Sequence, residues 1–358
     1  MEMISKNLLK DNKGYLTLID FFSLYYSRVN TKFTKQLKVE DVETGSLFNI
    51  LRSYFKVIRD FDNPVLCFDY RTGVKEYNPR LQTYEKYKYL RRQKRSEEYK
   101  KAYDWLKIFL SIVPYVGLYY DGYEGDDIIF SVVIDYQLNV NNIKNKFPYG
   151  VIILTVDSDL WYLKKFKNVY VIDLKGYEFI DLARIKKKYD ILNPEGIMWL
   201  KLFHGDTSDN IPSAVIGNKS LFSKKIKSLI DNNQLPNFID VIKDCQSNNY
   251  YDCIKVITLS EIESILKEYN LLDYINFEQL KINYELILFR YININDVKLT
   301  YRSGNEKRYV EVCNEYKFRQ VPDFKQYKDL VDVKLSKIIN KLGLKFKIGD
   351  KNDGLRLF

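Results

Sequence analysis

The sequence has 358 residues, of which 46% are hydrophobic, and it carries 57 Lys or Arg against 47 Asp or Glu, a formal net charge of +10. This length accommodates one large domain with an extension or two smaller domains. The positive balance indicates a polyanionic partner such as a nucleic acid. Four cysteines without C-x-x-C spacing and a single histidine, His204, argue against a structural zinc site.

The cysteines and the apolar segments indicate a cellular location. The apolar stretch from Tyr15 to Tyr26 is too short to span a bilayer and contains Asp20, and no signal peptide is recognisable. We therefore predict a protein of the cytoplasm, in a host cell or a phage replication compartment. We expect its cysteines to be reduced packing residues, namely Cys67, Cys245, Cys253 and Cys313.

In chain order, strand-like and helix-like segments alternate through the first half. Strands are predicted over residues 15–19, 65–68, 116–119, 151–155 and 169–172, and helices over residues 47–59, 82–112, 126–138 and 180–189. Such alternation predicts an α/β fold with a mainly parallel central sheet flanked by helices.

The second half has a different pattern. Residues 194–271 are mostly helical in pattern. Residues 297–302 and 308–312 alternate around Ser303, Gly304 and Asn305, which is typical of a β-hairpin.

Nine acidic residues between positions 20 and 209 fall into five short clusters, nearly all of which follow a predicted strand. They are Asp20, Asp69, Glu124, Asp126, Asp127, Asp157, Asp159, Asp206 and Asp209. In a parallel sheet the carboxyl ends of the strands meet at one edge, where ligands gather. Five clusters at one edge would repel each other severely unless cations lay among them.

Carboxylates in this number predict a site for Mg²⁺, for which Mn²⁺ is expected to substitute. These hard ions prefer oxygen ligands and keep several waters, so one or two direct carboxylates per ion suffice. Two such ions about 4 Å apart activate a water and stabilise the leaving oxygen of a phosphodiester. The alternative interpretation, that the acids are helix caps and solvated loop residues, applies to any one cluster better than to all five.

Three motifs in this order carry a resemblance to a known family. They are Glu124-Gly-Asp126-Asp127, Asp157-Ser-Asp159 and Gly205-Asp206-Thr-Ser-Asp209-Asn210-Ile211-Pro212, with Asp20 and Asp69 upstream. Over residues 15–230 the chain resembles the 5′-nuclease superfamily of flap endonucleases and 5′-3′ exonucleases, particularly its bacteriophage members. The resemblance implies a PIN-like fold with a helical arch and a helix-turn-helix DNA-binding portion.

The resemblance also implies roles for the acids. Asp20, Asp69, Glu124, Asp126 and Asp127 would serve a first metal centre, and Asp157, Asp159, Asp206 and Asp209 a second.

A basic segment lies between the second and third acidic clusters. Residues 80–101 hold nine Lys or Arg and three Glu, which suits an arch that phosphates pass, although solvated helices often carry such charges. Tyr87-Lys88-Tyr89-Leu90-Arg91 resembles the family's Tyr-Lys-x-Asn-Arg signature, which implies that Lys88 and Arg91 hold the scissile phosphate. In a helix, the i,i+3 spacing of Lys88 and Arg91 lets both side chains face one phosphate.

The predicted DNA contacts of this basic segment are Tyr87, Arg92, Lys94 and Arg95. Tyr84, Tyr87 and Tyr89 could stack on bases, but at this spacing some must pack inward.

The segment after Asp209 resembles a helix-three-turn-helix less closely. Of the family's Gly-x-x-Gly-Ile-Gly-x-Lys-Thr pattern it keeps Gly217, Lys219 and Ser220, so we do not expect bound potassium. Duplex contact is predicted at Gly217, Lys219, Lys224 and Lys225, although surface solubility also explains the lysines. His204 adjoins the predicted metal loop, and we interpret it as a hydrogen-bonded structural residue.

We therefore predict three parts. Residues 1–190 form a catalytic α/β nuclease domain with an arch at 80–112, residues 191–275 a helical duplex-binding portion, and residues 276–358 an extension of unknown role.

The predicted activity of this monomeric enzyme is Mg²⁺-dependent hydrolysis near 5′ ends or flaps in branched or nicked DNA and RNA:DNA hybrid, as in primer or flap removal during phage replication. A junction-resolving or RNA-directed nuclease and a noncatalytic DNA-binding scaffold are the alternatives.

The last residues form a separate motif. The tail 349–358 ends in Gly354-Leu355-Arg356-Leu357-Phe358, which resembles peptides that bind a sliding clamp. Leu355, Leu357 and Phe358 could fill an apolar pocket of such a clamp, or they could dock on the protein's own C-terminal region.

Overall fold

The computed structural model describes residues 14–29, 36–40, 42–89, 97–242, 247, 249–318, 324, 337–338 and 340–342. Its centre is a seven-stranded sheet with strand order β11-β5-β4-β1-β6-β7-β8. The strands are β1 (Tyr15–Asp20), β4 (Pro64–Cys67), β5 (Pro114–Tyr119), β6 (Gly150–Thr155), β7 (Val169–Asp173), β8 (Glu178–Phe179) and β11 (Lys298–Ser303). The five central strands pair in parallel, and only the edge strands β8 and β11 run antiparallel to their neighbours. The predicted α/β fold is confirmed.

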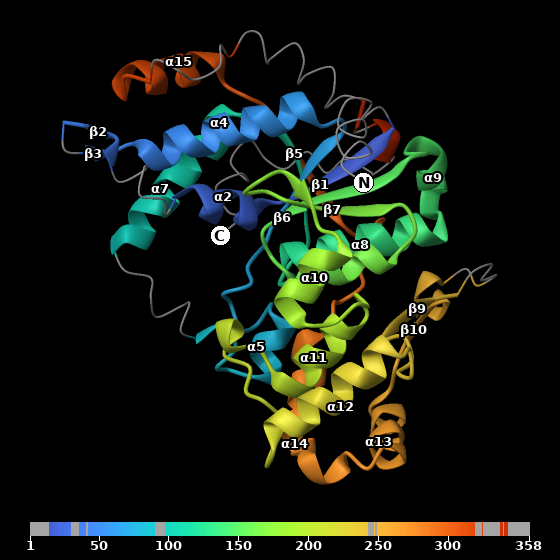
Figure 1. Ribbon diagram of the computed structural model, residues 1–358. Helices are drawn as coiled ribbons and strands as arrows, with labels where there is room; N and C mark the ends of the chain where they lie inside the picture. The colour runs from blue at the N-terminus through green and yellow to red at the C-terminus, as the bar shows by residue number, and fades with distance from the viewer. Residues whose placement is uncertain are drawn as a thin grey trace.

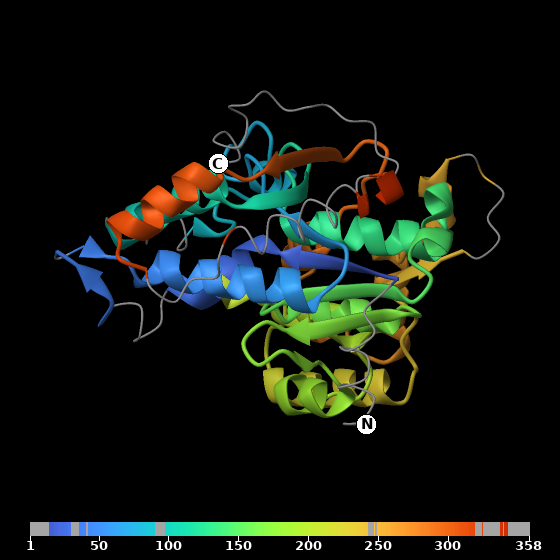
Figure 2. The same ribbon diagram turned by 90° about the horizontal axis from the view of Figure 1, so that it is seen from above.

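Helices cover both faces of the sheet, as Figures 1 and 2 show. Helix α2 (Phe21–Val29) packs on β1 and β6 and contacts α4 (Gly45–Asp60), which in turn contacts α7 (Glu97–Ile112). On the other face, α8 (Gly125–Leu138) packs against β1, β4, β5 and β6. All six residues of β1 and of β6 are buried, which is why both strands consist mainly of apolar residues.

A mostly helical portion lies below the sheet in Figure 1. Its longer helices are α10 (Leu182–Tyr189), α11 (Gly196–His204), α12 (Lys219–Asp231), α13 (Leu259–Glu268) and α14 (Phe277–Ile287). Helix α14 packs on α11 and on the short helix α5 (Pro79–Thr83). The short strands β9 (Ile239–Val241) and β10 (Ile254–Val256) form a separate antiparallel pair.

The remaining elements are short or lie at the margins. They are β2 (Lys38–Val39), β3 (Val42–Glu43), α9 (Ile143–Lys146), α15 (Glu306–Glu315) and the 3₁₀ turns η1 (Val140–Asn142), η2 (Asp159–Lys165), η3 (Thr207–Asp209), η4 (Tyr250–Cys253) and η5 (Leu272–Tyr274). Among the described residues, no helix combines the length and the apolar character that crossing a bilayer requires.

The predicted hairpin after residue 297 is wrong. Its first half is β11, but this strand pairs with β5 at the edge of the main sheet. Its second half lies in α15, where the side chain of Asn305 accepts a hydrogen bond from the backbone N–H of Arg308 at 3.0 Å and so caps the helix. Part of the region predicted to be a C-terminal extension, strand β11, thus belongs to the main sheet.

The continuous helix predicted over residues 82–112 is also wrong. After α5 the chain makes turns through residues 85–88, and Lys88 has a φ of 52°, in the left-handed region. Helix structure is described again from Glu97. Residues 90–96, which include Arg91, Arg92, Lys94 and Arg95, lie outside the described residues, as does the tail 349–358.

One cysteine departs from expectation. Cys253 is disulfide-bonded, whereas Cys67 and Cys313 are free thiols. The prediction that all the cysteines are reduced is therefore wrong for Cys253.

Candidate active site

Adjacent parallel strands bring the predicted acids to one edge of the sheet. Asp20 is the last residue of β1, Asp69 follows β4 by two residues, and Asp157 follows β6 by two. Because β4, β1 and β6 are neighbours, their carboxyl ends lie side by side.

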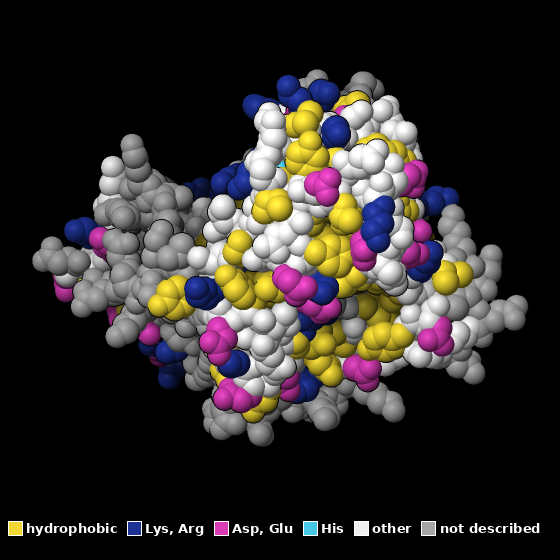
Figure 3. Space-filling view, turned by 90° about the horizontal axis from the view of Figure 1, so that it is seen from below, with side chains coloured by type: hydrophobic (Ala, Val, Ile, Leu, Met, Phe, Trp, Pro, Cys, Tyr) yellow, Lys and Arg dark blue, Asp and Glu magenta, His cyan; other side chains and the backbone are white. Residues whose placement is uncertain are grey.

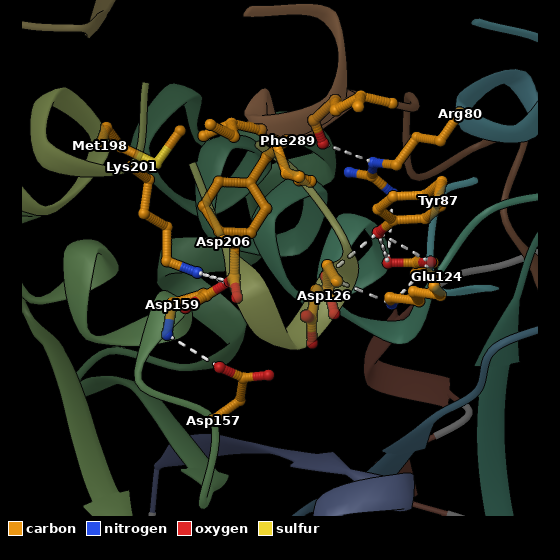
Figure 4. Close-up of a pocket in the computed structure, with 15 residues that line it drawn as sticks. Arg80, Tyr87, Glu124, Asp126, Asp157, Asp159, Met198, Lys201, Asp206 and Phe289 are labelled. Carbon is orange, nitrogen blue, oxygen red and sulfur yellow. Dashed lines mark hydrogen bonds and ion pairs between the residues drawn. The ribbon is translucent and has the colours of Figure 1, made fainter. Parts of the chain in front are cut away.

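A pocket at this edge gathers most of the acidic side chains (Figure 4). Six of the nine predicted acids line it, together with three cations, Arg80, Lys88 and Lys201. The six are Glu124, Asp126, Asp157, Asp159, Asp206 and Asp209. Figure 4 shows Tyr87 and Glu124 on one side of the pocket, Lys201, Asp159 and Asp206 on the other, and Asp126 between them.

Asp20 and Asp69 lie close to this pocket. Asp20 is buried and accepts hydrogen bonds from Ser23 and from Thr155 Oγ1, the latter at 2.7 Å. Burial and the neighbouring Asp157 raise the pKa of Asp20. Asp69 accepts a hydrogen bond from the backbone N–H of Gly125 at 2.7 Å. Burial and Glu124 raise its pKa to about 7.

The pocket acids repel each other as well. Burial, then Asp20 and Asp157, raise the pKa of Asp126 well above its ordinary range. Burial and Asp157 raise the pKa of Asp159 to about 7. Carboxylates held this close resist ionisation unless positive charge is supplied.

Lys88 supplies positive charge on one side of the pocket. Its ammonium lies 2.8 Å from Oε1 of Glu124 and 3.9 Å from Oδ2 of Asp209, and its backbone N–H donates to the carbonyl of Asp209 at 2.8 Å. Burial alone would raise the pKa of Glu124, but the positive charges of Lys88 and Arg80 lower this pKa to about 2. The left-handed turn at Lys88, rather than a helix, thus brings this side chain to the acids.

The neighbouring Tyr87 does not fit its predicted role as a DNA contact. Its side chain is 3% exposed, and its hydroxyl donates to the carboxylate of Glu124 at 3.1 Å. The ring packs inward and is not available for stacking on a base. Tyr89, which is 45% exposed, points outward instead.

Lys201 occupies the other side of the pocket, and sequence reasoning missed it. Its ammonium lies 2.6 Å from Oδ2 of Asp206 and also pairs with Asp159. Burial alone would raise the pKa of Asp206, but the positive charge of Lys201 lowers this pKa to about 2. Lys201 is on α11, five residues before Asp206, and this nearness in sequence was the available signal.

Asp127 is a predicted metal ligand whose carboxylate is engaged by Arg80 instead of lining the pocket. It is fully buried, and its two carboxylate oxygens lie 2.7 Å from the two terminal nitrogens of Arg80. Successive residues of a helix point about 100° apart, so Asp126 faces the pocket while Asp127 faces away from it. The prediction that Asp127 binds a metal does not fit this geometry.

In the ranges that the structure describes, no three Asp, Glu, His or Cys side chains converge tightly enough to hold one ion as they stand. Lys88 lies between Glu124 and Asp209, and Lys201 between Asp159 and Asp206. The donor set nevertheless fits hard divalent cations, because it consists of carboxylates in excess over the lining cations.

The predicted duplex-binding residues lie on the helical portion. Lys219, Lys224 and Lys225 are exposed on α12, and Gly217 has a φ of 67° with open space beside it. Figure 3 shows Lys and Arg side chains gathered along one margin of the lower face. His204 Nε2 lies 3.1 Å from the hydroxyl of Ser223 on α12.

Comparison with known families identifies a related domain. Residues 15–190 match the family described as 5′-3′ exonuclease, N-terminal resolvase-like domain. This match spans β1 to β8 and includes Asp20, Asp69, Glu124, Asp126, Asp157 and Asp159. No curated relative matches the sequence.

Solved structures are similar over most of the chain. Bacteriophage T5 D15 protein, co-crystallised with metal ions, is 15% identical with a TM-score of 0.45, and 91% of this chain and 99% of that chain are covered. T5 5′-exonuclease with bound zinc is 17% identical with a TM-score of 0.47, covering 92% and 99%. Human GEN1 in complex with Holliday junction DNA is 14% identical with a TM-score of 0.44, covering 97% and 80%.

Proposed function

Since residues 15–190 belong to the 5′-3′ exonuclease N-terminal, resolvase-like domain family, a family of nucleases, we propose that this protein is a structure-specific 5′ nuclease. It uses Mg²⁺, or Mn²⁺ in its place, to hydrolyse phosphodiesters near 5′ ends or flaps. The observation that carries this proposal is the convergence of six carboxylates on one pocket beside Lys88.

Two groups of residues would hold the metal ions. Glu124 and Asp126, with Asp20 and Asp69 nearby, form one group, and Asp157, Asp159, Asp206 and Asp209 form the other. Bound there, divalent ions lower the pKa of a water and stabilise charge on the phosphodiester oxygens.

The residues of the chain supply the remaining chemistry. Lys88 donates from its ammonium to an oxygen of the scissile phosphate, exchanging its ion pair with Glu124 for one with the substrate. Arg91 serves the same phosphate. Tyr87 keeps Glu124 oriented through the hydrogen bond from its hydroxyl.

The basic surfaces bind the flanking nucleic acid. Lys219, Lys224, Lys225 and the backbone at Gly217 contact duplex phosphates, and Arg92, Lys94 and Arg95 contact the single strand. The substrates are branched or nicked DNA and RNA:DNA hybrid, as in flap or primer removal during phage replication in a host cytoplasm. The protein acts as a monomer, without bound potassium, and its tail residues Leu355, Leu357 and Phe358 bind a sliding clamp.

A gel assay on 5′-labelled flap DNA tests the proposal. We expect cleavage with Mg²⁺, none with EDTA, and none in an Asp126→Ala variant. Parallel reactions on nicked DNA, four-way junctions and RNA:DNA hybrid separate a flap nuclease from a junction-resolving or RNA-directed enzyme. Binding of flap DNA without cleavage of any of these substrates would indicate a noncatalytic scaffold and overturn the proposal.

A further inference from the structure

Arg80 is buried, and its side chain makes four hydrogen bonds and two ion pairs. Its side chain is 6% exposed. The Nε group donates to the carbonyl of Leu286 at 3.0 Å, and one terminal nitrogen donates to the carbonyl of Leu288 at 3.1 Å and to Asp127 at 2.7 Å. The other terminal nitrogen lies 2.7 Å from Asp127 and 3.3 Å from Glu124. Four of the five guanidinium N–H groups donate hydrogen bonds in these contacts, and the ion pair with Glu124 completes a set that a lysine could not reproduce.

The carboxylate of Asp127 is equally saturated. Oδ1 accepts from Arg80 and from the backbone N–H of Arg290 at 2.9 Å. Oδ2 accepts from Arg80 and from the backbone N–H of Glu124 at 3.2 Å. A carboxylate offers about four lone-pair positions, so these four bonds leave none for a metal ion.

From this geometry we infer that Arg80 and Asp127 form a positioning pair. The pair holds Glu124 and Asp126 at the pocket, and Asp127 itself binds no metal ion. This inference rests on the proposed function, because it concerns the site at which the metals would bind.

The contacts of the pair explain how it acts. Asp127 accepts a hydrogen bond from the backbone N–H of Glu124, and Arg80 forms an ion pair with the side chain of Glu124 at 3.3 Å. Both contacts orient the residue with which Lys88 pairs. Arg80 is on α5, which the turns at residues 85–88 follow directly. The buried ion pair between Arg80 and Asp127 therefore holds two segments together, the start of α8 at Glu124 and the end of α5 that precedes the turns at residues 85–88.

Helix α8, which carries Asp127, also holds the segment 290–294 through a ladder of three regularly spaced hydrogen bonds. Alternate backbone N–H groups of that segment donate to side chains one turn apart on α8: Arg290 to Asp127 at 2.9 Å, Ile292 to Ser131 at 3.0 Å, and Ile294 to Asp135 at 2.9 Å. Four helical residues rise about 6 Å, and two extended residues span about 6.6 Å, so the two spacings match. The segment that follows α14 thereby helps to hold α8, the helix that carries Asp126 and Asp127, in place.

A double-mutant cycle with two readouts tests the inference. The variants are Arg80→Met, Asp127→Leu and the double variant, with Asp126→Asn as a metal-facing reference. Thermal unfolding without metal and Mn²⁺ affinity by electron paramagnetic resonance are measured for each full-length protein. Lys75→Met and Glu85→Leu, which break an exposed ion pair nearby, form the matched control cycle.

Each single variant of the pair should lower the unfolding temperature by about 5 °C, because it leaves a buried charge alone. The double variant should lose less than the sum of the two. Each should also weaken Mn²⁺ binding by about tenfold, as loss of a positioning partner does. The control cycle should move neither readout.

The Arg80→Met result separates positioning from ligation by its sign. If Asp127 were a metal ligand, removing a nearby cation would leave Mn²⁺ affinity unchanged or raise it, and the effects of the two substitutions would add. Either result overturns the inference. Where a variant does not fold, Arg80→Lys and Asp127→Asn replace it, with the same expected directions.

Asp126→Asn distinguishes this inference from the proposed function. If it leaves Mn²⁺ affinity unchanged, the metal site itself is wrong. If it weakens Mn²⁺ binding and Asp127→Asn does so equally without lowering the unfolding temperature, the metal site stands and Asp127 is one of its ligands.

Discussion

The ammonium of Lys201 lies 2.6 Å from Oδ2 of Asp206 and also pairs with Asp159. It thus stands between two acids that would hold a metal ion, and a cation in that position competes with the metal. We predict that Lys201→Met raises Mn²⁺ affinity by about tenfold and lowers the unfolding temperature without metal, because Asp159 and Asp206 then repel each other. Titration calorimetry and thermal unfolding measure the two effects. Lys186→Met, an exposed change on α10, should show neither, and a weaker metal affinity in Lys201→Met would mean that Lys201 helps to build the site.

Lys88 is expected to act on turnover rather than on affinity. It reaches the acids from a turn, with its ammonium 2.8 Å from Glu124, and in the proposed mechanism it binds the phosphate that reacts. We predict that Lys88→Ala lowers kcat for flap cleavage by about a hundredfold or more and changes the Kd for flap DNA by about threefold or less. Lys86→Ala removes an exposed charge two residues away and serves as the control. Equal losses of kcat in both variants would mean that Lys88 contributes only its general positive charge and makes no specific contact with the reacting phosphate.

Asp126 separates binding from cleavage. Its pKa is raised by burial, Asp20 and Asp157, so removing its carboxylate relieves repulsion among the acids and removes a group that, in the proposed function, lies beside the phosphates of the substrate. We predict that Asp126→Ala abolishes cleavage while Kd for flap DNA stays the same or falls. Cleavage rates come from quenched-flow gels and affinities from fluorescence anisotropy. Cleavage near the wild-type rate would rule out Asp126 as a metal-binding residue.

The strands and their terminal acids could be predicted because both follow from periodicity. Buried parallel strands are short apolar runs, and the residue that follows each run lies at one edge of the sheet. The sequence pattern therefore predicts the positions of Asp20, the last residue of β1, and of Asp157 and Asp159, which follow β6.

Other features depend on contacts between distant residues, which no local pattern carries. Arg80 is one of nine cations in its segment. Its contacts with Asp127 and with the carbonyls of Leu286 and Leu288, the latter about two hundred residues away in sequence, distinguish it from the others. Asp126 and Asp127 are chemically identical neighbours, and their helix sends one to the pocket and the other to Arg80.

Ser131 lies in the middle of the ladder that holds the segment 290–294. Its hydroxyl accepts from the backbone N–H of Ile292 at 3.0 Å and donates to the carbonyl of Asp127 at 2.6 Å. Ser131→Ala should leave the N–H of Ile292 buried without its acceptor, at a cost of about 1–3 kcal/mol in the free energy of unfolding. Urea denaturation measures this loss. Ser264→Ala, which removes an exposed hydroxyl that bonds only to its own helix, should change it by about 0.5 kcal/mol or less.

Asp135, at the end of the same ladder, should make stability depend on pH. It is fully buried. Its carboxylate accepts from Tyr291 Oη at 2.5 Å and from the N–H of Ile294 at 2.9 Å. Burial outweighs these bonds and raises its pKa from an ordinary value of 3.8 to about 7. A carboxyl whose pKa is raised by folding contributes stability that is present below pH 4 and is lost as the pH rises through about 7.

Asp135→Asn, which has no proton to lose, should therefore become more stable relative to the wild type as the pH rises from 4 to 8. The relative change should amount to several kcal/mol, about 1.4 kcal/mol for each pH unit between the two pKa values. Urea denaturation of both proteins at pH 5, 6, 7 and 8 measures the difference, in which the titration of the other carboxyl groups cancels. Parallel stability profiles for the two proteins would show that Asp135 titrates alike in the folded and unfolded states, and the burial argument for this ladder would then be wrong.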